Sequence, residues 1–141
     1  MRGACTLDAL AAGIAEAGAG GERLAALDGW RGEVFAALYA PDGSRLWEPA
    51  VYRPEELAAR LAELDEPPSV AGSGAVRFRQ ELAQGGVRIP DDSDPVHRVA
   101  ARHVCALAAA GGSDADGLAP IYLRPPDAER WRERDASQRA Q

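Results

Sequence analysis

The stretch RLAALDGWRGEVFAALYAPDGSRLW, residues 23–47, decides the fold. Residues 24–27 predict a short strand that leads into an acidic, glycine-bearing turn. Val34–Tyr39 follows, and its side chains alternate with the period of two that is typical of a strand. The stretch therefore predicts two strands joined by the turn that begins at Asp28.

A second turn follows at Pro41-Asp42-Gly43, where proline presets one backbone dihedral and glycine supplies a positive one. Residues 46–52 predict a third strand. Pro49 has no backbone N–H to donate, so this strand must lie at a sheet edge or contain a bulge. The whole region predicts a three-stranded antiparallel meander.

Helical patterns flank the meander on both sides. Thr6 is a good N-cap for a helix whose apolar side chains recur at helical spacing: Leu7, Leu10, Ala11 and Ile14. Pro54 suits the first turn of another helix, with a stripe of Leu57, Leu61 and Leu64. A short buried strand is expected at residues 69–72, then a helix at residues 75–84 and a further strand at residues 87–89.

Asp94 is expected to cap the most clearly amphipathic helix of the second half. Its apolar face comprises Val96, Val99, Ala100, Val104 and Leu107. We expect this face to be buried, so that Leu107→Ala would cost ~2–5 kcal/mol. A last strand is predicted at residues 121–123. The sequence thus predicts one domain over residues 1–126 and a polar, disordered tail over residues 127–141.

The expected order of elements is three strands, a helix, a strand, two helices and a strand. An antiparallel meander followed by crossover helices is the arrangement of ribonuclease-H-like domains, which form each lobe of the actin-like ATPase superfamily. The predicted fold class is therefore α/β with a mixed sheet, as a single actin-like lobe. A fold of this kind does not by itself define a function.

Composition restricts the class of protein. The chain has 141 residues and a net charge of −6, and all 16 basic residues are arginines that form no basic cluster. Direct nucleic-acid binding is therefore not expected, because phosphate contacts dominate such affinity. Cys5 and Cys105 are expected to be reduced thiols. The sequence shows no signal peptide and no apolar run long enough to span a membrane, which predicts a cytoplasmic protein.

Two glycine-bearing turns are candidate anion sites. The turn after Asp28 could cradle a phosphate with backbone amides, but Trp30 is bulky and further glycines are lacking, so we favour a plain hairpin turn. Gly72-Ser73-Gly74 lies between a strand and a helix and could hold an anion. The motif is too short for a dinucleotide fingerprint, so we favour a helix cap.

The remaining polar residues predict no catalytic, cofactor-binding or metal-binding site. His97 and His103 are placed on one helix, with His103 on its apolar face, as a buried, hydrogen-bonded core histidine. Cys105 is expected to be a surface thiol. The acidic runs DDSD and SDADG lack the glutamate that closes a calcium loop. We expect no enzyme activity, and neither binding nor hydrolysis of ATP.

Several segments, taken together, resemble the TsaB (YeaZ) family. They are CTLDALA from Cys5, LDGWRGEVFAALYAPDG from Leu27, VAGSGA from Val70 and APIYLRPPDA from Ala119. Their order and spacing match a family pattern of a helix, an Asp-Ala-Arg-Arg-x-Glu-Val-Tyr hairpin, a Gly-x-Gly turn and a terminal Pro-x-Tyr-Leu-Arg. The matching positions are Asp28, Arg31, Glu33, Val34, Phe35, Gly72, Gly74, Pro120, Tyr122, Leu123 and Arg124.

The resemblance implies a role in the synthesis of N6-threonylcarbamoyladenosine at position 37 of tRNAs. TsaB is a catalytically silent, actin-like partner of TsaD, the subunit that transfers the threonylcarbamoyl group. Older labels call the superfamily a glycoprotease or peptidase, and nothing in this sequence supports proteolysis. One departure from the family pattern is Gly29-Trp30, where Ala-Arg is usual.

A second departure is that family members begin with another lobe, which docks on TsaD and mediates self-association. This sequence resembles the C-terminal lobe alone. We therefore expect the apolar stripe of its first helix to be incompletely covered. The isolated chain would then self-associate or be marginally stable, and it would not bind TsaD by itself. The alternative is a stand-alone, divergent actin-like lobe that acts as a protein-interaction module or has no function.

Overall fold

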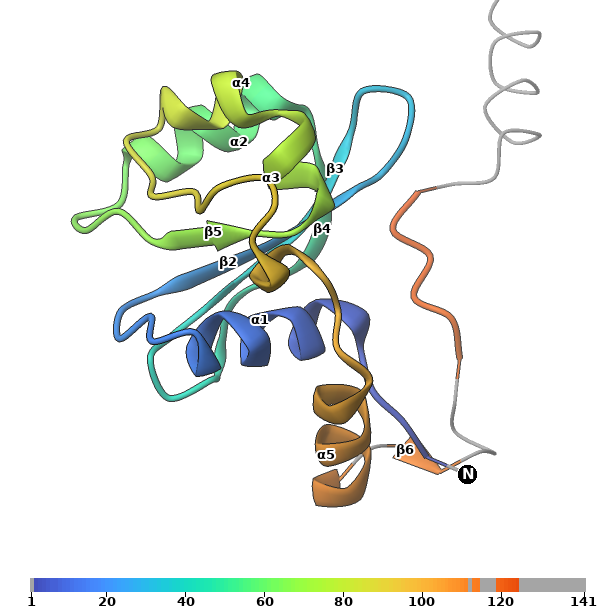
Figure 1. The fold of residues 1–141 in the computed structure, drawn as a ribbon. Coiled ribbons are helices and arrows are strands. Elements are labelled where there is room, and N and C mark those ends of the chain that lie inside the picture. The colour runs from blue at the N-terminus through green and yellow to red at the C-terminus, as the bar shows by residue number, and fades with distance from the viewer. Residues whose placement is uncertain (1, 112, 115–118, 125–141) are drawn as a thin grey trace, which may run out of the picture.

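The computed structural model describes residues 2–111, 113–114 and 119–124 (Figure 1). In chain order its elements are β1 (Arg2–Gly3), α1 (Thr6–Glu16), β2 (Arg23–Asp28), β3 (Val34–Tyr39), β4 (Arg45–Tyr52), α2 (Pro54–Ala62), β5 (Ser69–Ala71), α3 (Ser73–Arg77), α4 (Arg79–Ala83), the 3-10 helix η1 (Pro95–His97), α5 (Ala101–Gly111) and β6 (Ser113–Asp114). The predicted tail, residues 127–141, lies outside the described residues.

The centre of the fold is a four-stranded mixed sheet in the order β4-β3-β2-β5. β2, β3 and β4 form the predicted antiparallel meander, and β5 pairs with β2 in parallel. β4 lies at the edge of the sheet, and the register between β3 and β4 shifts near Leu38. Both features suit Pro49, which cannot donate to a regular ladder. The predicted mixed α/β architecture is confirmed.

Helices cover both faces of this sheet, as Figure 1 shows, with α2, α3 and α4 on one side and α1 on the other. Alternate residues of β2 divide between the two faces: Leu24 and Ala26 join the core under α2, α3 and α4, whereas Ala25 joins the core under α1. This division follows from the period of two along a strand. The result is a three-layer α/β/α arrangement with an apolar core on each face.

The apolar stripe of α1 is covered, which corrects the expectation of an open stripe. Leu7, Leu10 and Ile14 are all buried. Leu7 and Leu10 pack on the sheet with Ala37 and Tyr39 of β3. Ile14 packs with Ala71 of β5 and Val96 of η1, so the sheet and η1 together bury the stripe.

The long helix predicted after Asp94 is interrupted. Asp94 does act as a cap, because its Oδ1 accepts a hydrogen bond from the N–H of Val96 at 2.9 Å, but the element that it caps is the short η1. The chain then becomes extended at Arg98, and α5 begins at Ala101. Tertiary hydrogen bonds of His97, described below, fix η1 in the core and override the helical periodicity.

The predicted burial of this helix is therefore wrong in part. Val96 is buried, whereas Val99, Val104 and Leu107 are only half-buried, and α5 contains no buried residue. The helix packs against α1 and β1 at the edge of the molecule rather than across the sheet. Its apolar side chains face a groove and the solvent instead of the core.

Smaller differences concern short elements. The helix expected at residues 75–84 is the pair α3 and α4, which meet at Phe78. Residues 87–89 contribute one parallel bridge, between Ser69 and Arg88, instead of a strand. Residues 121–123 form no strand. Short β1 pairs with β6 in a second sheet that the sequence did not predict. In the part of the chain that the structure describes, no helix is both long and apolar enough to cross a membrane.

Candidate interaction groove

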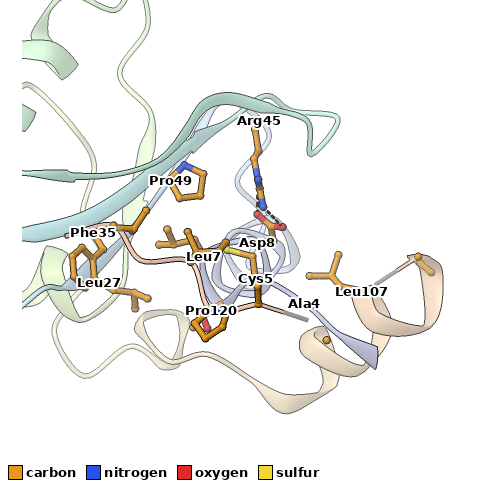
Figure 2. A pocket seen from close by; sticks show the side chains of 17 residues that line it. Ala4, Cys5, Leu7, Asp8, Leu27, Phe35, Arg45, Pro49, Leu107 and Pro120 are labelled. Atoms are coloured by element: carbon orange, nitrogen blue, oxygen red, sulfur yellow. Dashed lines mark hydrogen bonds and ion pairs between the residues drawn. The ribbon is translucent and has the colours of Figure 1, made fainter. Parts of the chain in front are cut away.

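An open groove of about 860 Å³ lies beside the first turn of α1 (Figure 2). Its walls come from α1, from one corner of the sheet, from α5 and from residues 119–123. The side chains labelled around it are Ala4, Cys5, Leu7, Asp8, Leu27, Phe35, Arg45, Pro49, Leu107 and Pro120. We call this feature the groove.

The groove is mostly apolar because α1 is too short to cover the whole sheet. Leu27 and Phe35 are directly paired across β2 and β3. Both are half-buried, because they lie on the part of the sheet that α1 does not cover. Pro49 of the edge strand adds a third apolar surface. A continuous apolar surface of this kind is typical of a site that binds another protein segment or an apolar ligand.

A charged network closes one end of the groove. Asp8 forms a bidentate pair with Arg45, with Nε–Oδ1 and Nη2–Oδ2 distances of 2.9 and 2.7 Å. Tyr39 donates its hydroxyl to Asp8 Oδ1 at 2.6 Å, and Glu48 binds the other side of Arg45 at 2.9 Å. Burial, assisted by the Asp8 carboxylate, raises the pKa of Tyr39. The network holds α1 to the β3–β4 hairpin, and each charged group in it has a partner of opposite charge.

Tyr39→Phe is expected to lower the free energy of unfolding by about 1.5–3 kcal/mol, the range for a hydrogen bond to a charged group. The hydroxyl lies in a buried side chain, and its loss removes one partner of Asp8 while Arg45 remains. Chemical denaturation measures the change. Tyr122→Phe is the control because Tyr122 is exposed. Equal midpoints for the two variants would contradict the importance of this bond.

Residues 119–123 form one side of the groove, and Arg124 anchors the end of this segment. Arg124 pairs with Glu33 at 2.6 Å and also donates to the carbonyl oxygen of Gly29 at 3.4 Å. Both charged side chains are half-buried. Glu33 and Arg124 lie in two separate segments of the resemblance to the TsaB family, and the fold brings them together. Both positions match the family pattern, but the sequence alone does not indicate that they pair.

The turn between β2 and β3 is a hairpin turn, as predicted. Its amides bond within the turn: Gly29 donates to the Glu33 carbonyl at 2.8 Å, and Trp30 donates to Asp28 Oδ1 at 3.0 Å. The other carboxylate oxygen of Asp28 pairs with Arg77 at 2.7 Å. These amides and this carboxylate are therefore engaged inside the protein, which supports a structural role over a phosphate cradle.

The same turn is strained. Trp30 and Arg31 have φ values of 59° and 57°, in the left-handed region that side chains disfavour, and Gly32 follows at 79°. A left-handed backbone costs a residue with a side chain roughly 1–2 kcal/mol. Trp30 gains little by burial, since it is 72% exposed. The turn thus holds an exposed tryptophan at a cost to stability.

Trp30→Gly is expected to raise the free energy of unfolding by about 1 kcal/mol, because glycine adopts positive φ without strain although it gains entropy when unfolded. Trp30→Ala is the matched control, since alanine also removes the indole but keeps the Cβ. Thermal and chemical denaturation compare the two. A glycine variant no more stable than the alanine variant would show that the turn is not strained.

Gly72-Ser73-Gly74 serves close packing and helix capping. Gly72 is the N-cap of α3 and has a φ of 121°. A Cβ at Gly72 would lie 2.0 Å from the carbonyl oxygen of Ala26, and one at Gly74 would lie 2.9 Å from the backbone of Leu27. The hydroxyl of Ser73 accepts a hydrogen bond from the N–H of Asp28 at 3.0 Å. The favoured prediction of a cap is confirmed, and both glycines let α3 approach β2.

The buried histidine is His97, so the prediction of that role for His103 is wrong. His97 Nδ1 accepts the N–H of Gly72 at 3.1 Å, and Nε2 faces the carbonyl oxygens of Pro90 and Asp91 at 3.2 and 3.0 Å. It therefore carries its proton on Nε2 and ties η1 to the N-terminus of α3 and to the loop at Pro90 and Asp91. His103 lies at the edge of α5, where its Nε2 is 2.8 Å from Glu16 without hydrogen-bond geometry.

The other polar candidates have structural partners too. Cys5 is half-buried in the groove, and Cys105 is exposed, as predicted. In the acidic run after Pro90, Asp92 pairs with Arg79 at 2.6 Å and Asp94 caps η1. Within residues 2–111, 113–114 and 119–124, no group of three or more His, Cys, Asp or Glu side chains could hold a metal ion.

Comparison with known proteins gives a structural relative. No protein-family model matches the chain, and no curated protein matches it. A solved structure described as that of an uncharacterized protein with similarity to peptidase YeaZ from Pseudomonas aeruginosa is similar, with 26% sequence identity and a TM-score of 0.54. The similarity covers 82% of this chain and 56% of that chain. The chain thus has the fold of just over half of a YeaZ-like protein.

Proposed function

We propose that this protein is a non-catalytic TsaB-like subunit of the machinery that makes N6-threonylcarbamoyladenosine at position 37 of tRNAs. It acts in the cytoplasm, as one ribonuclease-H-like, actin-like lobe. The observation that carries the proposal is the likeness to the YeaZ-like structure, at 26% identity over 82% of this chain. The pairing of Glu33 with Arg124, two positions that match the family pattern, supports it further.

A scaffold role suits the polar groups of the described residues better than a catalytic role. The partners of His97 are backbone groups, and the close partner of His103 is the carboxylate of Glu16. Nucleophilic catalysis requires a base within hydrogen-bond reach of a hydroxyl or thiol. The hydroxyl of Ser73 instead accepts a backbone N–H, and Cys5 lies among apolar side chains in the groove.

The groove is the surface through which this lobe joins the assembly. The chain spans only 56% of the YeaZ-like chain, and we propose that a complementary lobe occupies the groove and brings the TsaD-like subunit with it. Phe35 and Leu27 supply the apolar contact, and the Asp8–Arg45 pair limits its extent.

Affinity purification from the native cells tests this proposal. Tagged protein is expected to co-purify with the TsaD-like subunit, whereas the purified chain alone does not bind it. Phe35→Glu places a charge in the groove and should abolish co-purification. Leu46→Glu is the control, because Leu46 is exposed on the edge strand and does not line the groove. Hydrolysis of ATP or of peptides by the purified chain would contradict the scaffold role.

A stand-alone interaction module is the second candidate, and one observation favours it. The apolar stripe of α1 is buried against the sheet, so the lobe has a closed core of its own on that face. Sedimentation distinguishes the two candidates. A stable monomer that binds neither a complementary lobe nor a TsaD-like protein would favour the module.

A further inference from the structure

A second open pocket, of about 360 Å³, lies between α1 and the turn that joins β3 to β4. It adjoins the groove, because Asp8, Arg45 and Leu107 line both. Its volume falls in the range of sites that bind small molecules. We call it the arginine pocket. Its other lining residues are Ala11, Ala12, Ala15, Arg23, Tyr39, Pro41, Asp42 and Gly43.

Arg23 is the buried charge of this pocket. It is the first residue of β2, and by the period of two along the strand it shares with Ala25 the sheet face under α1. The residue is only 5% exposed. An arginine is almost never buried to this extent unless an acidic group pairs with it. The surroundings of its guanidinium therefore show what kind of group is lacking.

The described residues leave Arg23 without a counter-ion. Its Nη2 donates to the carbonyl oxygens of Ala40 and Pro41 at 2.9 and 2.5 Å, which holds the β3–β4 turn. Within the described part of the chain, Nε and Nη1 donate to no acceptor, and no carboxylate lies within ion-pair distance of this side chain. A buried cation without a partner is costly, so an anion bound beside it would be stabilised.

The two carboxylates that line the pocket are bound elsewhere. Asp8 pairs with Arg45 and accepts the hydroxyl of Tyr39. Asp42 Oδ1 accepts the N–H and the hydroxyl of Ser44 at 2.9 and 2.6 Å, and these hydrogen bonds are the main cause of the lowered pKa of Asp42. Their negative charges would repel an anion that carries two charges. A guest with a single negative charge therefore suits the pocket best.

Small side chains leave the space beside the guanidinium open. Three alanines of α1 face the pocket, at positions 11, 12 and 15, and Leu107 of α5 adds apolar surface. A larger side chain on this part of α1 would occupy the pocket. The arginine pocket thus combines one uncompensated positive charge with an apolar wall.

We infer that the arginine pocket binds a small monocarboxylic acid with an apolar body. The carboxylate accepts hydrogen bonds from Arg23 Nη1, and the apolar body lies against the alanines of α1 and Leu107. The inference goes beyond the proposed function and does not depend on it, because neither a complementary lobe nor a TsaD-like subunit is needed to form this pocket.

Titration of the isotopically labelled chain with hexanoate tests the inference, and hexanamide is the matched uncharged compound. NMR is expected to show shifts at the Nε–H of Arg23 and at the amides of Ala12 and Ala15. Hexanamide should bind about tenfold more weakly, because it lacks the charge that strengthens the hydrogen bond to the guanidinium. Arg23→Gln should weaken the binding of hexanoate by about the same factor.

A second variant separates binding from folding, because Arg23 also holds the β3–β4 turn. Ala15→Leu fills the pocket and keeps Arg23, and leucine is a good helix former. It should weaken the binding of hexanoate about tenfold or more without loss of stability. Ala59→Leu is the matched control and should leave the affinity unchanged, because Ala59 is an exposed residue of α2 that does not line the pocket.

Several results would overturn the inference. They are an absence of shifts with hexanoate, equal binding of hexanamide, and an affinity for hexanoate that Ala15→Leu leaves unchanged. Inorganic phosphate that binds as tightly as hexanoate would contradict the preference for a single charge. A peptide with a C-terminal leucine that binds more tightly than hexanoate would make a protein terminus the occupant. None of these results bears on co-purification through the groove, so the two proposals fail separately.

Discussion

Gly72→Ala is expected to destabilise the protein by roughly 3–5 kcal/mol, the sum of overpacking and left-handed strain. The new Cβ would lie 2.0 Å from the carbonyl oxygen of Ala26 and 2.7 Å from Leu10 Cδ2. The first of these atoms belongs to the backbone of β2, an inner strand, and cannot move without disturbing the sheet. The φ of 121° adds a penalty that holds for any side chain.

Two other glycines provide controls for this variant. A Cβ at Gly20 would meet nothing within 4 Å, and its backbone has no positive φ, so Gly20→Ala should be neutral. Gly18 is equally open but has a φ of 97°, so Gly18→Ala should show the backbone penalty alone, about 1 kcal/mol. Urea denaturation measures the free energy of unfolding of the three variants. A loss in Gly72→Ala no larger than in either control would contradict the close approach of α3 to β2.

Leu61→Ala should cost ~2–5 kcal/mol, as the deletion of a buried leucine does. Leu61 is fully buried in the core between α2 and the sheet, with Leu24, Leu57 and Leu82. The matched comparison is Leu107→Ala, which is now expected to cost about 1 kcal/mol or less, because Leu107 is half-buried beside the groove. Equal losses in the two variants would mean that α5 belongs to the core after all.

The meander was predictable from the sequence because its signals are local. The alternation along Val34–Tyr39 and the turn at Pro41-Asp42-Gly43 are each contained within a few residues, and the structure retains both. Pro49 also indicated the edge position of its strand, since only an edge or a bulge tolerates the missing N–H.

The second half was less predictable because distant contacts decide it. Periodicity suggested one helix from Asp94, but His97 bonds to Gly72 and to the loop after Pro90, and this anchor ends η1 after one turn. The spacing of residues along the predicted helix does not indicate these hydrogen bonds. The assignment of the buried histidine to His103 failed for the same reason.

The groove and the turn between β2 and β3 show the same limit. Glu33 and Arg124 were both singled out in the sequence, yet their pairing requires the whole chain to fold between them. Trp30 was noted as a departure from the family pattern, but its exposure and left-handed backbone became visible only in the structure. Sequence patterns indicate which residues are unusual, whereas packing determines what they contact.

The most direct test of the proposed function is the content of N6-threonylcarbamoyladenosine in tRNA from cells that lack this gene. Mass spectrometry of nucleosides from total tRNA measures it. We expect the modified nucleoside to fall sharply, to return with the unaltered gene and to remain low with Phe35→Glu. An unchanged content after deletion would contradict the assignment to tRNA modification.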